Sequence, residues 1–378
     1  MNKIDRRTPA FWPQIFIFTF FLVLLRPADS LSFILFLPGL FIQSRTEKIR
    51  PLFLWLGWSF FSACLSPDLA ASLLDFSRES ILAFAGFSAG VYGQKDRRWL
   101  WVFQIWAALT IGLILLQAVV APPFPPSWVG SNAGARLPFR ATGLWNNPNR
   151  TGLFLAFLLP ILLAGTTEGQ TSSRRWTVPF YRGLIFLTIP ALLFTYSRTA
   201  WVAALVALAF YWGRGEKAKL RRLVLIICLL MAFIPSVADR VGENPLQSET
   251  VRYRFRIWQE TWALVEKYPL TGGGSRKLQT ILGPLRADHA HNHYLQLAAE
   301  KGLPAVLFFG GLVYRLLKAP GRSGSSDQKL RLERGMQAAV VGQLVAGITE
   351  SLWVVPLFVF LFWFGFAMVT ADASRENC

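Results

Sequence analysis

Long apolar segments recur along most of this chain, and they limit its fold more than any other feature. A transmembrane helix needs roughly twenty mostly apolar residues, or fewer where it is buried in a bundle. This length rule predicts about twelve spans. They lie at approximately 10–25, 29–43, 51–66, 72–93, 99–120, 150–167, 182–196, 198–213, 221–236, 303–317, 336–350 and 352–371. The composition, 53% hydrophobic and 16% charged, agrees with an all-α polytopic membrane protein.

Basic residues in the short loops predict how the spans are oriented. The loops rich in lysine and arginine fall on one side when the spans alternate, and the positive-inside rule makes that side cytoplasmic. Both termini are then expected inside, and the first apolar run is expected to be a retained signal anchor. The net charge of +18 is explained by this topology, so nucleic acid is not an expected partner.

The loops divide the chain into three parts. Residues 1–236 hold roughly the first nine spans and an outer loop at about 121–149. Residues 237–302 form a large periplasmic loop, and residues 303–378 hold the last spans and a cytoplasmic C-terminus. All three histidines of the chain lie in the large loop, so we expect the catalytic function there.

Residues 252–268 predict an amphipathic helix lying on the membrane surface, because aromatic and aliphatic residues recur there every three or four positions. Arg254 lies four residues before Trp258 and therefore near the membrane-facing stripe, whereas Arg252 lies on a different face. A cation close to the membrane requires an anionic partner.

The histidines alternate with other residues as His289, His291 and His293. On a strand all three would share one face, as a metal site prefers, whereas on a helix His291 would point away from the other two. The residues up to Gly302 favour a helix. A zinc site is the weaker alternative, because no cysteine lies nearby.

Histidine and arginine on the outer face suit chemistry on a phosphorylated lipid. A neutral histidine can accept a proton from a hydroxyl group, and arginines bind phosphate oxygens. Two more arginines are expected on this face. Arg140 precedes Asn149, a candidate helix N-cap, and Arg198 lies between two spans, where it binds either a lipid phosphate or a substrate anion. Such a site needs no divalent metal and no cofactor.

Four motifs follow one another between about residues 140 and 305. They are Arg140-Ala141-Thr142-Gly143 with Asn147-Pro148-Asn149, Ser197-Arg198, Arg254 before Trp258 with Tyr268-Pro269-Leu270-Thr271-Gly272, and His291-Asn292 followed by Gly302. Their order and the number of spans resemble the O-antigen ligase / Wzy-type polymerase superfamily of bacterial envelope proteins. The next glycine of the ligase pattern is Ala305 here.

The resemblance implies an inverting, metal-independent glycosyltransferase embedded in the bacterial inner membrane. It would move a glycan from undecaprenyl pyrophosphate to an acceptor hydroxyl on the periplasmic face. His291 matches the proposed base of the family, and Arg198 and Arg254 match the arginines that hold the pyrophosphate, with Arg252 as an alternative to Arg254. The other expected substrate-binding residues are Arg140, Asn149, Asn292 and His293.

The two leading functions, ligase and polymerase, differ in the acceptor of the glycan. A ligase would act on the lipid A core of lipopolysaccharide, whereas a polymerase would lengthen undecaprenyl-linked chains. The expected partners are the lipid-linked donor, one of these acceptors and membrane lipids. A transporter or flippase fits the span count, but it would show ionisable residues at mid-membrane and an inverted repeat, and neither is clear in the sequence. A metal-binding membrane sensor is a third alternative.

Overall fold

The computed structural model describes residues 49–94, 96–121, 139–145, 147–166, 177–213, 249–319 and 327–371. Within these ranges the regular secondary structure consists of α-helices and three short 3₁₀ helices, which confirms the all-α prediction. The expected spans at 10–25, 29–43 and 221–236 lie outside the described residues, as does most of the outer loop at 121–149.

Each expected span within the described ranges corresponds to a helix. These helices are α3 (Arg50–Cys64), α4 (Leu69–Gly93), α5 (Trp99–Val120), α6 (Pro148–Gly165), α8 (Thr177–Phe194), α9 (Arg198–Trp212), α15 (Leu303–Lys318), α16 (Asp327–Ala346) and α17 (Pro356–Thr370). Among the described residues, α5 and α6 are long and apolar enough to cross a membrane by length and composition, and three shorter apolar helices accompany them. The number of membrane crossings stays a prediction.

Two boundaries in the C-terminal part differ from the sequence prediction. Helix α16 begins at Asp327 rather than near residue 336, because a charged segment precedes its apolar part and is also helical. The last helix begins at Pro356 rather than at residue 352, after a 3₁₀ turn at Leu352–Val354. Proline is well suited to the first turn of a helix, where its missing N–H group is not needed.

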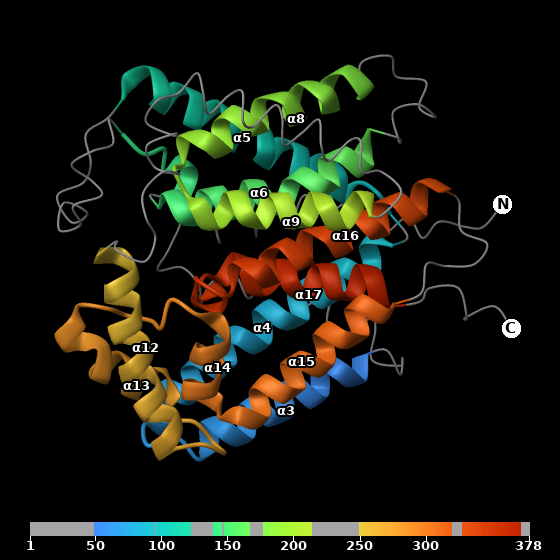
Figure 1. Cartoon of the computed structure of the whole chain (residues 1–378). Coiled ribbons are helices and arrows are strands. Elements are labelled where there is room, and N and C mark those ends of the chain that lie inside the picture. The colour runs from blue at the N-terminus through green and yellow to red at the C-terminus, as the bar shows by residue number, and fades with distance from the viewer. Residues whose placement is uncertain are drawn as a thin grey trace, which may run out of the picture.

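Small residues let the central helices of the bundle approach closely. Helix α4 lies beside α17 in Figure 1. A Cβ atom added to Gly86 or Gly90 would lie 2.4 or 2.3 Å from the backbone oxygen of Phe360 or Phe364. Large apolar side chains such as Phe186 and Leu307 face outward, as expected for helices surrounded by lipid.

Three further helices form a compact unit at one end of the bundle, shown in yellow and orange in Figure 1. They are α12 (Glu249–Lys267), α13 (Gly274–Leu282) and α14 (His293–Lys301). The amphipathic helix predicted at 252–268 is therefore present. Its buried side contains Ile257 and Leu264, which pack in one cluster with residues of α13 and α14, whereas Phe255 and Trp262 are exposed. The expected apolar stripe is therefore divided, because Val265 is buried in the same cluster and Trp258 packs against it. The position of α12 on the membrane surface stays a prediction.

The helix predicted around the histidines begins later than expected. Helix α14 starts at His293, and the side chain of Asn292 caps it by accepting a hydrogen bond from the Leu295 N–H at 2.9 Å. His289 and His291 precede the helix, and His291 has a left-handed backbone with φ of 49°. The N-cap therefore separates these two histidines from the helical third one.

Two glycines dock the segment after α12 against the end of α14. Gly272 and Gly302 have φ of 72° and 81°, in the left-handed region that favours glycine. A Cβ atom on Gly302 would lie 2.0 Å from the backbone oxygen of Leu270. The Gly273 N–H donates to the Ala299 oxygen at 2.8 Å. These backbone contacts fix the position of α14, which follows the histidine segment.

Candidate active site

A carboxylate, Glu350, lies in the turn between α16 and α17 and contacts side chains from distant parts of the chain. Its Oε1 accepts a hydrogen bond from Nδ2 of Asn149 at 2.9 Å and lies 3.2 Å from Nη2 of Arg254. Its Oε2 lies 3.8 Å from Nδ1 of His291, which is an ion-pair distance rather than a hydrogen bond. We call Arg140, Asn149, Arg254, His291 and Glu350 the Glu350 cluster.

Arg140 joins this cluster through Asn149. Its Nη2 donates to Oδ1 of Asn149 at 3.0 Å, and its Nε donates to the Thr195 oxygen at 3.1 Å. The prediction that Asn149 caps α6 is wrong, because the cap is Asn147, whose side chain accepts from the Asn149 and Arg150 N–H groups. The side chain of Asn149 is therefore free of the capping role and bridges Arg140 to Glu350.

Arg198 opens α9 at the same end of the bundle. Ser197 precedes it as the N-cap, and the neighbouring Thr199 hydroxyl lies 2.8 Å from the hydroxyl of Thr349. Because Thr349 directly precedes Glu350, this contact ties the start of α9 to the turn that carries the carboxylate. Positive side chains close to a helix N-terminus strengthen its attraction for anions.

Helix α12 positions two parts of the cluster at once. Arg254 and Trp258 lie on one face of it, as the four-residue spacing predicts. Arg254 reaches Glu350, and Nε1 of Trp258 donates to the Ala290 oxygen at 2.9 Å. Ala290 lies between His289 and His291, so the tryptophan holds the histidine segment beside the carboxylate.

Electrostatics keep Glu350 charged and His289 neutral. Burial raises the pKa of Glu350, but the interaction with His291 and the charge of Arg254 outweigh it and hold the pKa below its usual value. Burial, the adjacent His291 and Arg150 lower the pKa of His289 to about 4. The two imidazole rings are in contact, with centroids 4.1 Å apart.

Three expected site residues lie elsewhere. Arg252 is exposed on another face of α12, and Asn292 serves as the cap of α14. The His293 ring is fully buried, with Phe309 and Trp353 ring centroids 5.1 and 5.2 Å away. The three histidines therefore do not converge, and within the described ranges no group of His, Cys, Asp or Glu is arranged to hold a metal ion.

Sequence reasoning missed Glu350. The sequence contains one weak indication of it: Glu350 is a carboxylate in the short turn between the last two expected spans, on the side where the candidate arginines are also expected. The requirement of Arg254 for an anionic partner was recognised, yet the partner in the structure is a protein carboxylate. A carboxylate close to one nitrogen of an imidazole stabilises the imidazolium that forms when the other nitrogen accepts a proton from a hydroxyl group.

A comparison with family models places part of this site in a known family. Residues 183–310 match the model described as O-antigen ligase. None of the curated proteins compared with the chain matches it. The matched region contains Arg198, Arg254 and His291, whereas Arg140, Asn149 and Glu350 lie outside it. Proteins of this family are polytopic membrane proteins that transfer glycans, and lipid-linked glycans are their general substrates. The resemblance to the O-antigen ligase family is thereby confirmed over residues 183–310.

Proposed function

We propose that the protein transfers a glycan from undecaprenyl pyrophosphate to a hydroxyl of the lipid A core, on the periplasmic face of the inner membrane. The observation that carries this proposal is the pairing of His291 with Glu350 beside Arg254. It combines a base for a hydroxyl with a positive side chain for a phosphate, on the part of the chain expected to face the periplasm.

In the proposed reaction, His291 takes the proton of the acceptor hydroxyl. The acceptor oxygen forms a bond to the anomeric carbon of the donor sugar, and the bond from that carbon to the pyrophosphate oxygen breaks. Undecaprenyl pyrophosphate leaves with the bonding electrons, and the anomeric configuration inverts. Glu350 stabilises the imidazolium that forms.

Arg198 and Arg254 are assigned to the donor pyrophosphate. Guanidinium groups bind phosphate oxygens in a fixed geometry and stabilise the charge that develops on a leaving phosphate. Arg254 is a better candidate than Arg252, because it lies beside Glu350 with its side chain 18% exposed, whereas Arg252 faces away. The charges are supplied by the protein, so the proposed mechanism needs no metal.

Polymerisation of lipid-linked repeat units is the second candidate. The same groups would act on it, and the acceptor would be a second undecaprenyl-linked chain. The observation in its favour is Ala305, which stands where the ligase pattern has a glycine.

Reconstitution tests the proposal and separates the two acceptors. The purified protein is supplied with an undecaprenyl-pyrophosphate-linked glycan and with either core lipid or a second donor molecule. We expect transfer to core lipid, and we expect His291→Ala, Arg198→Ala and Arg254→Ala each to abolish it without loss of folded protein. Arg256→Ala, an exposed position on α12, is the matched control. Normal transfer by the His291 variant would contradict the proposal.

A further inference from the structure

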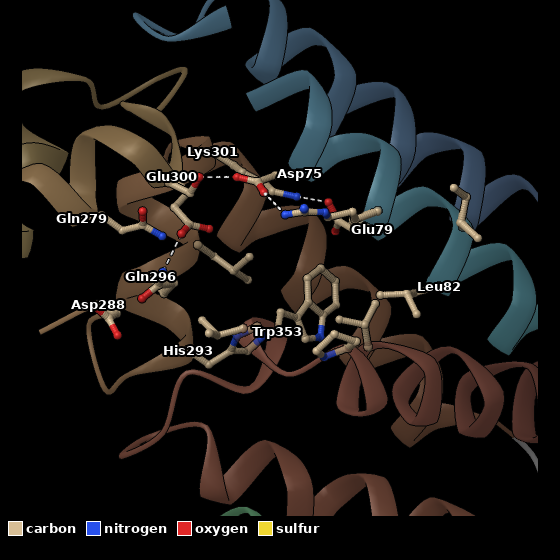
Figure 2. A pocket seen from close by; sticks show the side chains of 17 residues that line it. Asp75, Glu79, Leu82, Gln279, Asp288, His293, Gln296, Glu300, Lys301 and Trp353 are labelled. Carbon is tan, nitrogen blue, oxygen red and sulfur yellow. Dashed lines mark hydrogen bonds and ion pairs between the residues drawn. The ribbon is translucent and has the colours of Figure 1, made fainter. Parts of the chain in front are cut away.

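A cavity with a volume of about 280 Å³ is lined by residues outside the Glu350 cluster. Figure 2 shows side chains from α4, α13, α14 and the connection before α17 around it. Nothing in the proposed reaction uses this cavity. Its volume is close to the lower end of the range for small-molecule binding sites.

The lining of the cavity is rich in hydrogen-bonding groups. Asp75 and Glu79 come from α4, Gln279 comes from α13, and Gln296 and Glu300 come from α14 (Figure 2). Two cations also line it, and both are paired with carboxylates: Arg78 lies 3.7 Å from Asp75, and Lys301 bonds to Glu79. The cavity therefore offers several acceptors, and its two cations are already paired with carboxylates.

His293 points to a ligand in this cavity. It lines the cavity, its side chain is fully buried, and neither ring nitrogen has a hydrogen-bond partner among the described residues. Burial and the nearby Lys301 lower its pKa to about 3, so the ring is neutral at physiological pH and has one N–H donor and one acceptor. Buried polar groups are almost always hydrogen-bonded, which makes an unpartnered pair of nitrogens unusual.

We propose that the cavity binds one uncharged sugar residue of the acceptor. Hydroxyl groups donate to carboxylates and amide oxygens and both donate to and accept from a neutral imidazole, so a sugar ring matches this lining. The indole of Trp353 provides a flat apolar surface for the less polar face of the ring.

The carboxylates of the lining disfavour an acidic sugar. A sugar carboxylate would face Asp75, Glu79 and Asp288, and like charges in a partly buried site repel one another.

Gln296 connects this cavity to the proposed base. Its Oε1 accepts hydrogen bonds from the Ala290 N–H at 2.6 Å and from the Ser351 hydroxyl at 3.1 Å. Ala290 precedes His291 and Ser351 follows Glu350, so the wall of the cavity is continuous with the segments that carry both groups. The assignment of the bound sugar to the acceptor rests on the proposed function, whereas the binding of an uncharged sugar does not.

Binding of a simple sugar by the full-length protein in lipid nanodiscs tests the cavity without any transfer reaction. The probes are methyl β-D-glucoside and glucuronate, measured by saturation-transfer NMR. Gln279→Trp places a large ring at an exposed position of the lining, and Thr280→Trp is the matched control, exposed on the same helix and outside the lining. We expect the glucoside signal in the wild type and in the control, and its loss in Gln279→Trp.

Three results would overturn the binding site: no glucoside signal in the wild type, equal signals in Gln279→Trp and the wild type, or glucuronate binding as strong as glucoside binding. Glucoside binding that depends on Gln279, in a protein that transfers no glycan, would instead contradict the proposed function and leave the sugar site intact.

His293→Phe separates ligand binding from a structural role. Phenylalanine keeps the ring and removes both unpartnered nitrogens, so we expect thermal stability without acceptor to be unchanged or higher. The concentration of hexose-terminated core lipid at half-maximal transfer should rise roughly two- to ten-fold for the lost hydrogen bonds, with the value for the donor unchanged. An unchanged acceptor value would contradict the role of His293 in sugar binding.

Discussion

The substitution Glu350→Gln tests the catalytic pair directly. Glutamine keeps the size of the side chain and an oxygen that can accept from Asn149, but it removes the negative charge beside His291. Two unit charges about 4 Å apart interact by about 4 kcal/mol at an effective dielectric constant of about 20. The Glu350 Oε2 and His291 Nδ1 atoms are 3.8 Å apart and both side chains are mostly buried, so this estimate applies to the imidazolium formed in the proposed reaction.

This loss sets the expected effect on the rate. Each 1.36 kcal/mol of transition-state stabilisation corresponds to a ten-fold change in rate, so kcat should fall by about 10²- to 10³-fold. The assay is transfer in the reconstituted system, with kcat and both KM values measured at saturating concentrations of the second substrate. Glu260→Gln, at an exposed position of α12, is the control for the loss of one carboxylate on the same part of the protein.

A fall in kcat of less than ten-fold, in a variant that melts like the wild type, would refute the reasoning. It would mean that His291 carries no positive charge in the rate-limiting transition state, or that Glu350 does not stabilise that charge. A rise in KM for the donor alone would assign Glu350 to the positioning of Arg254 instead.

Three further predictions concern stability. Gly302→Ala should lower the free energy of unfolding by about 3 kcal/mol or more. Gly302 combines φ of 81° with ψ of 167°, a region reserved for glycine, and the new Cβ would lie against the Leu270 oxygen. A melting temperature equal to that of the wild type would contradict this. Gly90→Ala should destabilise the packing of α4 on α17, since its Cβ would lie 2.3 Å from the Phe364 oxygen, and unfolding in graded denaturing detergent measures it. Burial raises the pKa of Glu300 from 4.5 to about 7, so the native state binds this proton more tightly than the unfolded state and stability falls as pH rises through that interval. The Glu300→Gln variant should therefore have a higher melting temperature than the wild type at about pH 8 and the same melting temperature at about pH 5. An equal rise in melting temperature at both pH values would show that the raised pKa of Glu300 is not its cause.

The sequence predicted the helices well because the membrane imposes a simple rule on apolar length. Every expected span inside the described ranges is a helix, and the amphipathic helix of the large loop is present. The rule does not say which face of a helix is covered by protein. On α12, Ile257 is buried by neighbouring helices while Phe255 is exposed, and periodicity alone did not distinguish them.

The candidate site was only partly predictable for a related reason. The bond between Asn149 and Glu350 joins residues 201 positions apart, and the pairing of Arg254 with Glu350 spans 96 positions. Residue types and local spacing indicated histidine and arginine chemistry, but contacts over such separations depend on the packing of the whole bundle. A single carboxylate in a turn has no spacing pattern that would identify its partners.

The position of Glu350 near the end of the chain has a consequence for biosynthesis. Helices enter the membrane in order from the N-terminus, so Asn149, Arg254 and His291 are delivered before the hairpin of α16 and α17 that brings the carboxylate. A nascent protein released before this hairpin is made lacks the carboxylate that would stabilise the charged form of the proposed base. If the proposed reaction depends on this carboxylate, prematurely terminated copies would leave the pool of lipid-linked glycans untouched.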